Sequence, residues 1–177
     1  LDINKIDYWL CVDDNSSQED RNKMKKQYPF FEFIWKNESQ KGHYISMNMI
    51  RKYALDNNVE YLMHMEDDWH FVQKRNYIDE SLKIFNDNAK IGQVLFNINY
   101  AEVELSKRKC KGGHLKKTKD STRYYIHEHY DTNSKEYANF LEKYKGHGTC
   151  GYWPHFSFRP SIVKMDVLKD VGSYFNT

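Results

Sequence analysis

The 177-residue sequence has few cysteines, no long apolar run and little net charge. Its three cysteines, Cys11, Cys110 and Cys150, form no CxxC pair, which argues against a disulfide framework or a zinc ribbon and predicts a reducing, cytoplasmic compartment. No apolar stretch reaches the ~18 residues of a membrane-spanning helix. A formal net charge of +2 is too small to indicate nucleic acid as a partner.

The composition is that of a globular protein, with 40% hydrophobic and 16% aromatic residues. Residues 1–99 alternate short apolar runs with stretches of helical spacing. We expect strands near 8–12, 31–35, 60–66 and 92–96, and helices near 18–27, 44–56 and 78–85. This alternation predicts an α/β fold with a mostly parallel central sheet and helices on both of its faces.

The alternation stops after residue 99. Residues 101–123 are polar and rich in lysine, and two interpretations stay open: a contact for phosphate or nucleic acid, or, as we favour, a solvated loop. Further on, the sequence indicates a short strand at 124–126, a helix at 134–145 and a last helix that begins near Asp166.

Three consecutive acids follow the apolar run 61–65: Glu66, Asp67 and Asp68, with Trp69 next. Consecutive acids repel one another and are poor strand formers, so they carry a cost at the end of a strand. In open α/β sheets, ligands bind at that end. Magnesium binds through one or two carboxylates together with substrate phosphates. The residues therefore indicate either a metal-assisted site for a phosphate-bearing ligand or a solvated acidic turn.

Several segments together resemble family 2 glycosyltransferases with the A-type fold, a Rossmann-like fold that binds nucleotide sugars. The segment 12–17 resembles their VDDxS turn, and 61–68 resembles the strand with its DxD-type metal motif. Lys41-Gly42 and the helix with Asn48 resemble the segment between these two motifs. The segment 159–175 resembles the family's R…lxxvGgF segment. The order and spacing of these motifs carry the resemblance more than any one of them does.

The resemblance implies roles for the acidic residues. Asp14 would accept a hydrogen bond from the uracil ring N–H, with Asp13 supporting it, because a carboxylate is a strong acceptor for an N–H donor. Asp67 would reach the ribose hydroxyls. Asp68 would bind manganese or magnesium that bridges the two phosphates, with Glu66 close by.

Four further residues are candidates whose ordinary structural roles stay open. Lys41 would approach the diphosphate or the base, or is an ordinary loop lysine. Trp69 and Trp153 would stack on a sugar ring, although core packing is the more common role of a single tryptophan. His155 would join Asp68 on the metal or touch a phosphate, whereas a hydrogen-bonded structural histidine is the more common case.

The resemblance implies metal-dependent transfer of a sugar from a nucleoside-diphosphate sugar, UDP-sugar by the family's habit, to a hydroxyl of a glycan or of a protein- or lipid-linked acceptor, with inversion. We interpret residues 1–177 as one glycosyltransferase domain with a nucleotide-binding half, 1–99, and an acceptor-side half, 100–177. The family's first strand and its C-terminal catalytic carboxylate have no counterpart here, so we expect a fragment and assign no catalytic base.

Two other functions stay open. A nucleotidyltransferase of similar fold also has acidic metal sites, and it would show a Gly-rich loop after its first strand. A non-catalytic domain that binds carbohydrate or nucleic acid would instead depend on the aromatic residues and on the lysine-rich loop. In that case the three acids would have no role in binding.

Overall fold

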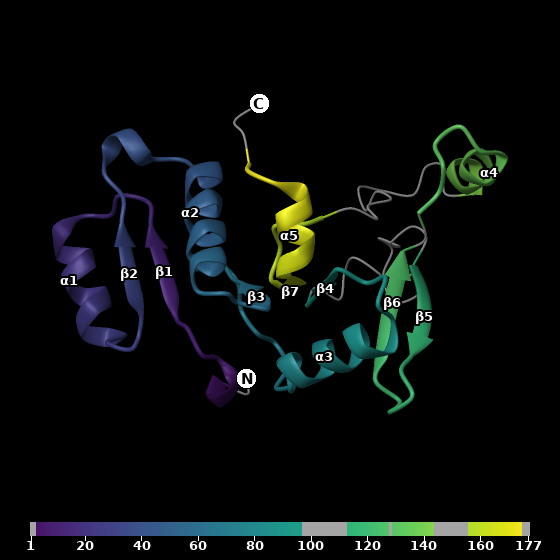
Figure 1. The fold of residues 1–177 in the computed structure, drawn as a ribbon, viewed down its shortest axis with the longest axis horizontal. Coiled ribbons are helices and arrows are strands. Elements are labelled where there is room, and N and C mark those ends of the chain that lie inside the picture. The colour runs from purple at the N-terminus through teal and green to yellow at the C-terminus, as the bar shows by residue number, and fades with distance from the viewer. Residues whose placement is uncertain (1–2, 97–112, 128, 144–155, 175–177) are drawn as a thin grey trace. The chain divides into compact units, whose positions relative to one another are not determined.

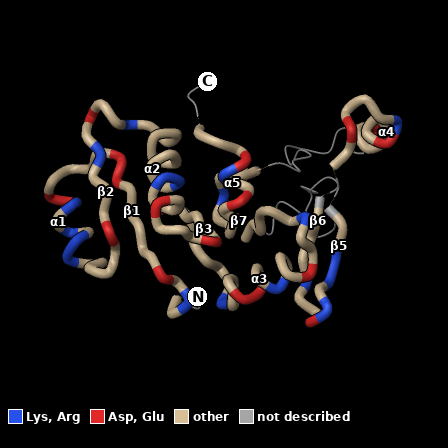
Figure 2. The backbone as a smooth tube through the Cα atoms, in the orientation of Figure 1, with Lys and Arg blue, Asp and Glu red and all other residues tan. Residues whose placement is uncertain are grey.

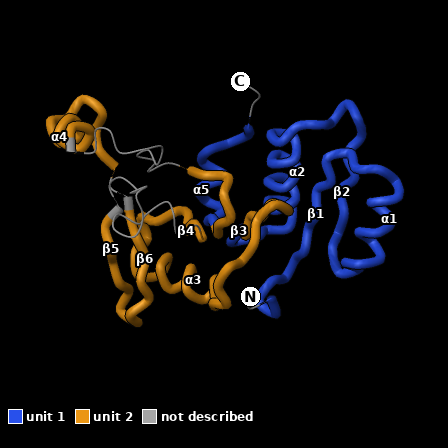
Figure 3. The backbone as a smooth tube through the Cα atoms, turned by 180° about the vertical axis from the view of Figure 1, so that it is seen from behind, with its two compact units in different colours: residues 1–62, 163–177 blue, residues 63–162 orange. Residues whose placement is uncertain are grey.

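The computed structural model describes residues 3–96, 113–127, 129–143 and 156–174 (Figure 1). They belong to two compact units, drawn in different colours in Figure 3. Unit 1 consists of residues 1–62 and 163–177, and unit 2 of residues 63–162. Every helix within the described ranges is too short or too polar to cross a membrane.

Unit 1 alternates strands and helices along its first 62 residues. Its elements are η1 (Ile3–Lys5), β1 (Leu10–Asp13), α1 (Gln18–Gln27), β2 (Glu32–Trp35), η2 (Glu38–Gln40), α2 (His43–Asp56) and α5 (Met165–Val171). The strands β1 and β2 pair in parallel, with Leu10 opposite Glu32 and Asp13 opposite Trp35. Asp13 and Trp35 therefore mark one end of this sheet.

Local sequence signals explain the helices of unit 1. Ser17 caps α1, because its hydroxyl accepts a hydrogen bond from the backbone N–H of Asp20 at 3.1 Å. Acidic residues lie in the first turn of α1 and lysines in its last turn (Figure 2), as the helix dipole favours. In α2, Met47 and Ala54 are buried seven positions apart, which places them on one face. This helix packs against β1 and α5.

Unit 2 contains α3 (Tyr77–Asp87), β4 (Gln93–Leu95), β5 (Gly113–Lys117), β6 (Arg123–His127) and α4 (Lys135–Lys143). The buried residues of α3 are Ile78, Ser81, Ile84 and Phe85, which share one face of the helix. The strands β5 and β6 form an antiparallel hairpin. Two more strands, β3 (Tyr61–His64) and β7 (Ser161–Lys164), contain the points at which the chain passes from one unit to the other.

The prediction of a mostly parallel central sheet with helices on both faces is wrong. The described strands form three small sheets, in the orders β1-β2, β3-β7-β4 and β5-β6. The only parallel sheet among them has two strands, and the other two sheets are antiparallel. The reason is β7, which lies between β3 and β4 in the sheet order. The prediction inferred a parallel sheet from the alternation of strands and helices over residues 1–99, whereas β7 comes from a distant part of the chain.

The individual elements agree with the sequence better than the sheet does. The helices predicted at 18–27, 44–56, 78–85, 134–145 and from 166 on are confirmed as α1 to α5. The strand predicted at 124–126 is confirmed as β6. Two strands were missed: β5, which lies in the segment taken as a solvated loop, and β7. The division into functional halves at residue 99 stays a prediction.

Candidate functional site

The carboxyl end of β1 carries Asp13, whose side chain is almost completely buried. Both carboxylate oxygens accept the backbone N–H of Ser16, at 3.1 and 3.3 Å, which closes the turn after the strand. Arg21 of α1 donates from Nε to Oδ2 of the same carboxylate at 2.8 Å. Burial alone raises the pKa of Asp13, but the hydrogen bonds from Ser16 and Arg21 outweigh it and hold this pKa below its ordinary value.

Asp14 lies one residue further along and is half exposed. Its Oδ1 accepts hydrogen bonds from the Lys36 ammonium and from the backbone N–H of Gly42, the latter at 3.1 Å. The hydrogen bond from Lys36 is the main reason why the pKa of Asp14 lies below its ordinary value; partial burial opposes it, and the Gly42 N–H and the charge of Lys41 add to it. Asp14 is therefore an ionised, partly exposed carboxylate at neutral pH.

Lys36 follows the end of β2 directly, and none of its side chain is exposed. Its backbone N–H donates to the carbonyl oxygen of Asp13 at 3.1 Å, which continues the parallel pairing by one residue. Its ammonium reaches Asp14, the carbonyl oxygen of Gly42 and the hydroxyl of Ser46. Lys36 thus connects the end of β1 to the first turn of α2.

Lys41, the lysine that the sequence suggested for a phosphate or base contact, is half exposed. Its ammonium lies 3.1 Å from one carboxylate oxygen of Glu38 and 3.2 Å from the other. Asn15, which has a positive φ of 72°, donates to the same carboxylate at 2.7 Å. The charge of Lys41 is therefore shared with Glu38.

In unit 2, the acidic turn follows β3. Glu66 is half-buried and accepts a hydrogen bond from the indole N–H of Trp69 at 3.3 Å. Asp67 and Asp68 are exposed, and within the described ranges no hydrogen bond or ion pair involves either side chain. These two carboxylates have the oxygen atoms and the accessibility that a hard divalent cation or a hydroxyl donor requires.

The structure brings together Asp13, Asp14 and Lys41 in unit 1, and Glu66, Asp67, Asp68 and Trp69 in unit 2. Trp153 and His155 lie outside the described residues, so their predicted contacts with sugar and metal stay predictions.

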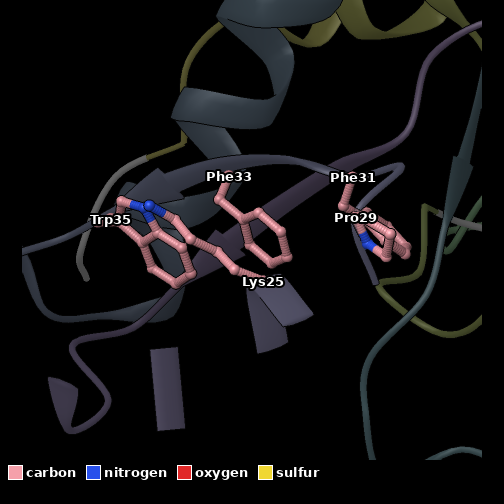
Figure 4. A pocket seen from close by; sticks show the side chains of 5 residues that line it. All are labelled: Lys25, Pro29, Phe31, Phe33 and Trp35. Carbon is pink, nitrogen blue, oxygen red and sulfur yellow. The ribbon is translucent and has the colours of Figure 1, made fainter. Parts of the chain in front are cut away.

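A hollow of about 400 Å³ lies beside β2 (Figure 4). It is lined by Lys25, Pro29, Phe31, Phe33 and Trp35. The rings of Phe33 and Trp35 stack at 4.7 Å, and the Lys25 ammonium lies 5.4 Å from the centre of the Trp35 ring. The described lining includes none of the predicted site residues, and we interpret the hollow as the space between α1 and the aromatic side of β2.

The sequence did not predict the contacts of three residues that shape the Asp13–Asp14 turn: Arg21, Lys36 and Gly42. A signal for Lys36 existed, since it directly follows the strand parallel to β1 and so falls beside Asp14. A signal for Gly42 also existed: a glycine directly before a predicted helix permits a backbone conformation that L residues rarely adopt, and the structure gives Gly42 a φ of 122°. Nothing local in α1 distinguishes Arg21 from its exposed basic neighbours.

Comparisons of the chain with protein-family models, with curated proteins and with solved structures found no match.

Proposed function

We propose that this chain carries the donor-binding part of a metal-dependent glycosyltransferase that uses a UDP-sugar. The observation that best supports this proposal is the state of Asp14: an ionised, half-exposed carboxylate with one oxygen held by two donors. An ionised carboxylate only accepts hydrogen bonds, so a neutral group that hydrogen-bonds to it has to present a donor. The uracil ring N–H is such a donor, and it lies between two carbonyl groups that present none.

The acidic turn of unit 2 supports the metal dependence. Asp67 and Asp68 are exposed carboxylates without partners among the described residues, and such oxygens suit Mn²⁺ or Mg²⁺. In the proposed function Asp68 holds the cation, Glu66 lies near it, and Asp67 accepts hydrogen bonds from the ribose hydroxyls. When bound, a divalent cation supplies positive charge that stabilises the diphosphate as it leaves.

Glycosyl transfer also needs a surface that holds the sugar and a base that takes the acceptor's proton. The ring of Trp69, fixed by its hydrogen bond to Glu66, is the candidate platform for the apolar face of a sugar. The acceptor hydroxyl attacks the anomeric carbon, the bond to the diphosphate breaks, and the hydroxyl proton goes to a base. We assign that base to no residue of this chain.

Titration calorimetry with UDP, in the presence and absence of Mn²⁺, tests the proposal. We expect binding that requires Mn²⁺, that Asp68→Ala abolishes and that Asp14→Asn weakens. Asp120→Ala is the matched control, because Asp120 is also an exposed acid of unit 2, with 66% of its side chain exposed, and should bind UDP like the unaltered protein.

Two other results would point elsewhere. UDP binding that is unchanged by the removal of Mn²⁺ and by Asp68→Ala would favour a non-catalytic binding domain. Tighter binding of UTP than of UDP would favour a nucleotidyltransferase. Either result would overturn the proposed glycosyl transfer.

A further inference from the structure

Lys36 is a fully buried lysine whose charge needs a specific partner. An ammonium has three hydrogens to donate, and Lys36 has three acceptors: Asp14 Oδ1, the Gly42 carbonyl oxygen at 2.9 Å and Ser46 Oγ at 2.7 Å. Only Asp14 among these carries a negative charge. Because a buried charge without a counter-charge is strongly unfavourable, the ion pair with Asp14 is what allows Lys36 to be buried.

The same contact leaves the two oxygens of Asp14 in different states. Oδ1 accepts from Lys36 and from the Gly42 N–H. No described residue donates to Oδ2, although 52% of the Asp14 side chain is exposed. The carboxylate is thus fixed through one oxygen, while the other keeps its full capacity to accept a hydrogen bond from a ligand.

We propose that Lys36 is a positioning residue of the donor site, which orients the Asp14 carboxylate for the nucleobase and does not itself touch the ligand. This inference rests on the proposed function. The complete burial of Lys36 supports it, since a side chain with no exposed surface has no face for a phosphate. Two donors hold the carboxylate: the Lys36 ammonium, directly after β2, and the N–H of Gly42, the N-cap residue of α2. The Ser46 hydroxyl, in the first turn of α2, accepts a hydrogen bond from the same ammonium and so helps to fix its position.

The inference differs from two simpler roles of a lysine in what it predicts for binding. A lysine that contacts phosphate would affect UDP but not uridine, which has no phosphate. A lysine that only stabilises the fold would weaken binding whether or not Asp14 is present. A lysine that acts through Asp14 affects uridine and UDP alike, and only while residue 14 is an aspartate.

The experiment is a double-mutant cycle in the full chain with Lys36→Met, Asp14→Asn and both together, and uridine and UDP as probes. We expect each single substitution to weaken both ligands about tenfold or more, which is typical of the loss of a charge-assisted hydrogen bond. In the Asp14→Asn background, Lys36→Met should change either affinity by less than about twofold. Further weakening in that background, or a loss for UDP alone, would overturn the inference.

Two additional variants keep the test decisive if Lys36→Met folds poorly. Lys36→Gln retains two N–H donors without the charge, and it should behave like Lys36→Met in the cycle. Ser46→Ala removes one acceptor of Lys36 but leaves the contact with Asp14, so we expect unchanged binding of both ligands. If Ser46→Ala weakened binding as much as Lys36→Gln, the contact with Asp14 would not be the important one.

A measurement without ligand separates this inference from the proposed function. The charged groups that act on Asp14 are Lys36, after β2, and Lys41, in the loop before α2. Carbon NMR of the carboxyl groups should show the pKa of Asp14 rising in Lys36→Gln, and rising less in Lys41→Gln.

If the protein binds neither uridine nor UDP, the proposed function fails and the ligand role of Lys36 fails with it. The titration of Asp14 would still decide whether Lys36 controls the charge of Asp14. An unchanged Asp14 titration in Lys36→Gln would overturn the positioning role even in a protein that binds UDP.

Discussion

Arg21 and Asp13 form an ion pair that joins α1 to the end of β1, with Nε 2.8 Å and the terminal nitrogen 2.7 Å from the same carboxylate oxygen. The Arg21 guanidinium also donates to the carbonyl oxygen of Lys36, which directly follows β2. One side chain therefore ties together the ends of two parallel strands. The positions of Asp14 and Lys36 depend on those ends, so the pair contributes to the candidate site without being part of it.

Replacement of Arg21 by methionine should destabilise the fold substantially. Asp13 would keep the N–H of Ser16 but lose its counter-charge, and only 3% of its side chain is exposed. Removing one partner of a buried ion pair costs about 3–5 kcal/mol, and because the Ser16 bond remains we expect a value near 3 kcal/mol. In urea unfolding, the variant should unfold at a lower midpoint concentration of urea, with the same dependence of the unfolding free energy on urea concentration.

Lys23→Met is the matched control for Arg21→Met. Lys23 lies on the same helix and pairs with Glu19 at 2.7 Å, but 63% and 79% of the two side chains are exposed. Exposed pairs of this kind contribute about 0.3–0.5 kcal/mol. Equal losses in the two variants would contradict the buried character of the Arg21–Asp13 pair.

Acid should weaken the contribution of Asp13 to stability. Its pKa is lower in the folded protein than the ordinary value of 3.8, so the unfolded chain takes up the proton first as the pH falls. The stabilisation is therefore present above pH 3.8 and is lost as the pH falls through the lower, folded pKa. In urea unfolding, the difference in stability between the unaltered protein and Asp13→Asn should narrow below about pH 4. A difference that stays constant down to about pH 2 would contradict the lowered pKa.

Helices were predictable from the sequence because their signals are local. Ser17 caps α1 through a residue three positions away, and the buried residues Met47 and Ala54 show their spacing within α2. Lys36 shows the limit of such signals. A lysine after a strand is normally a surface residue, and this one is buried only because Asp14, Gly42 and Ser46 supply its acceptors.

The sheet was not predictable for a related reason. Ile162 and Val163 of β7 are almost completely buried, yet a strand of four residues has too little periodicity to be distinguished from the start of the following helix. Its place between β3 and β4 depends on pairing with strands far away in the sequence. Lys41 shows a similar limit, since its partner Glu38 became clear only from the conformation of the loop, while its predicted contact with phosphate or base stays a prediction.

Tyr53 should titrate at an unusually high pH. Its hydroxyl donates to Glu32 at 2.6 Å, and this hydrogen bond, with smaller effects of burial, of the Glu32 charge and of Tyr8, raises the pKa of Tyr53 to about 12. Phenolate absorbance is followed against pH in the unaltered protein and in Tyr53→Phe, and the difference between the two curves gives the titration of Tyr53 alone. The raised pKa means that the stabilisation is complete below pH 10 and is lost as the pH rises towards about 12.

Two variants identify the cause of the raised pKa. Glu32→Gln removes the charge and should bring the titration of Tyr53 down towards its ordinary value of 10.0. Tyr8→Phe keeps the edge-to-face ring contact, with centroids 6.2 Å apart, and removes only the smallest of the effects that raise this pKa, so the pKa of Tyr53 should fall much less than in Glu32→Gln. A fall of the Tyr53 pKa in Tyr8→Phe as large as the fall in Glu32→Gln would refute the assignment to Glu32.

Asn48 should hold the segment after α5 against α2. Its side-chain amide donates to the carbonyl oxygen of Tyr174 at 2.8 Å and accepts the backbone N–H of the same residue at 2.8 Å. Asn48→Ala loses both bonds at once, and we expect the free energy of unfolding to fall by about 1–3 kcal/mol and the Tyr174 amide to exchange its hydrogen faster.

Two control variants test this role. Asn48→Asp keeps the acceptor but not the donor, so it should preserve more of the protection of the Tyr174 amide against exchange. Asn22→Ala, on exposed α1, should change neither stability nor this exchange rate, because among the described residues the Asn22 side chain hydrogen-bonds only to Gln18 of its own helix. If the Tyr174 amide exchanged equally slowly in Asn48→Ala, the segment after α5 would be held by other contacts.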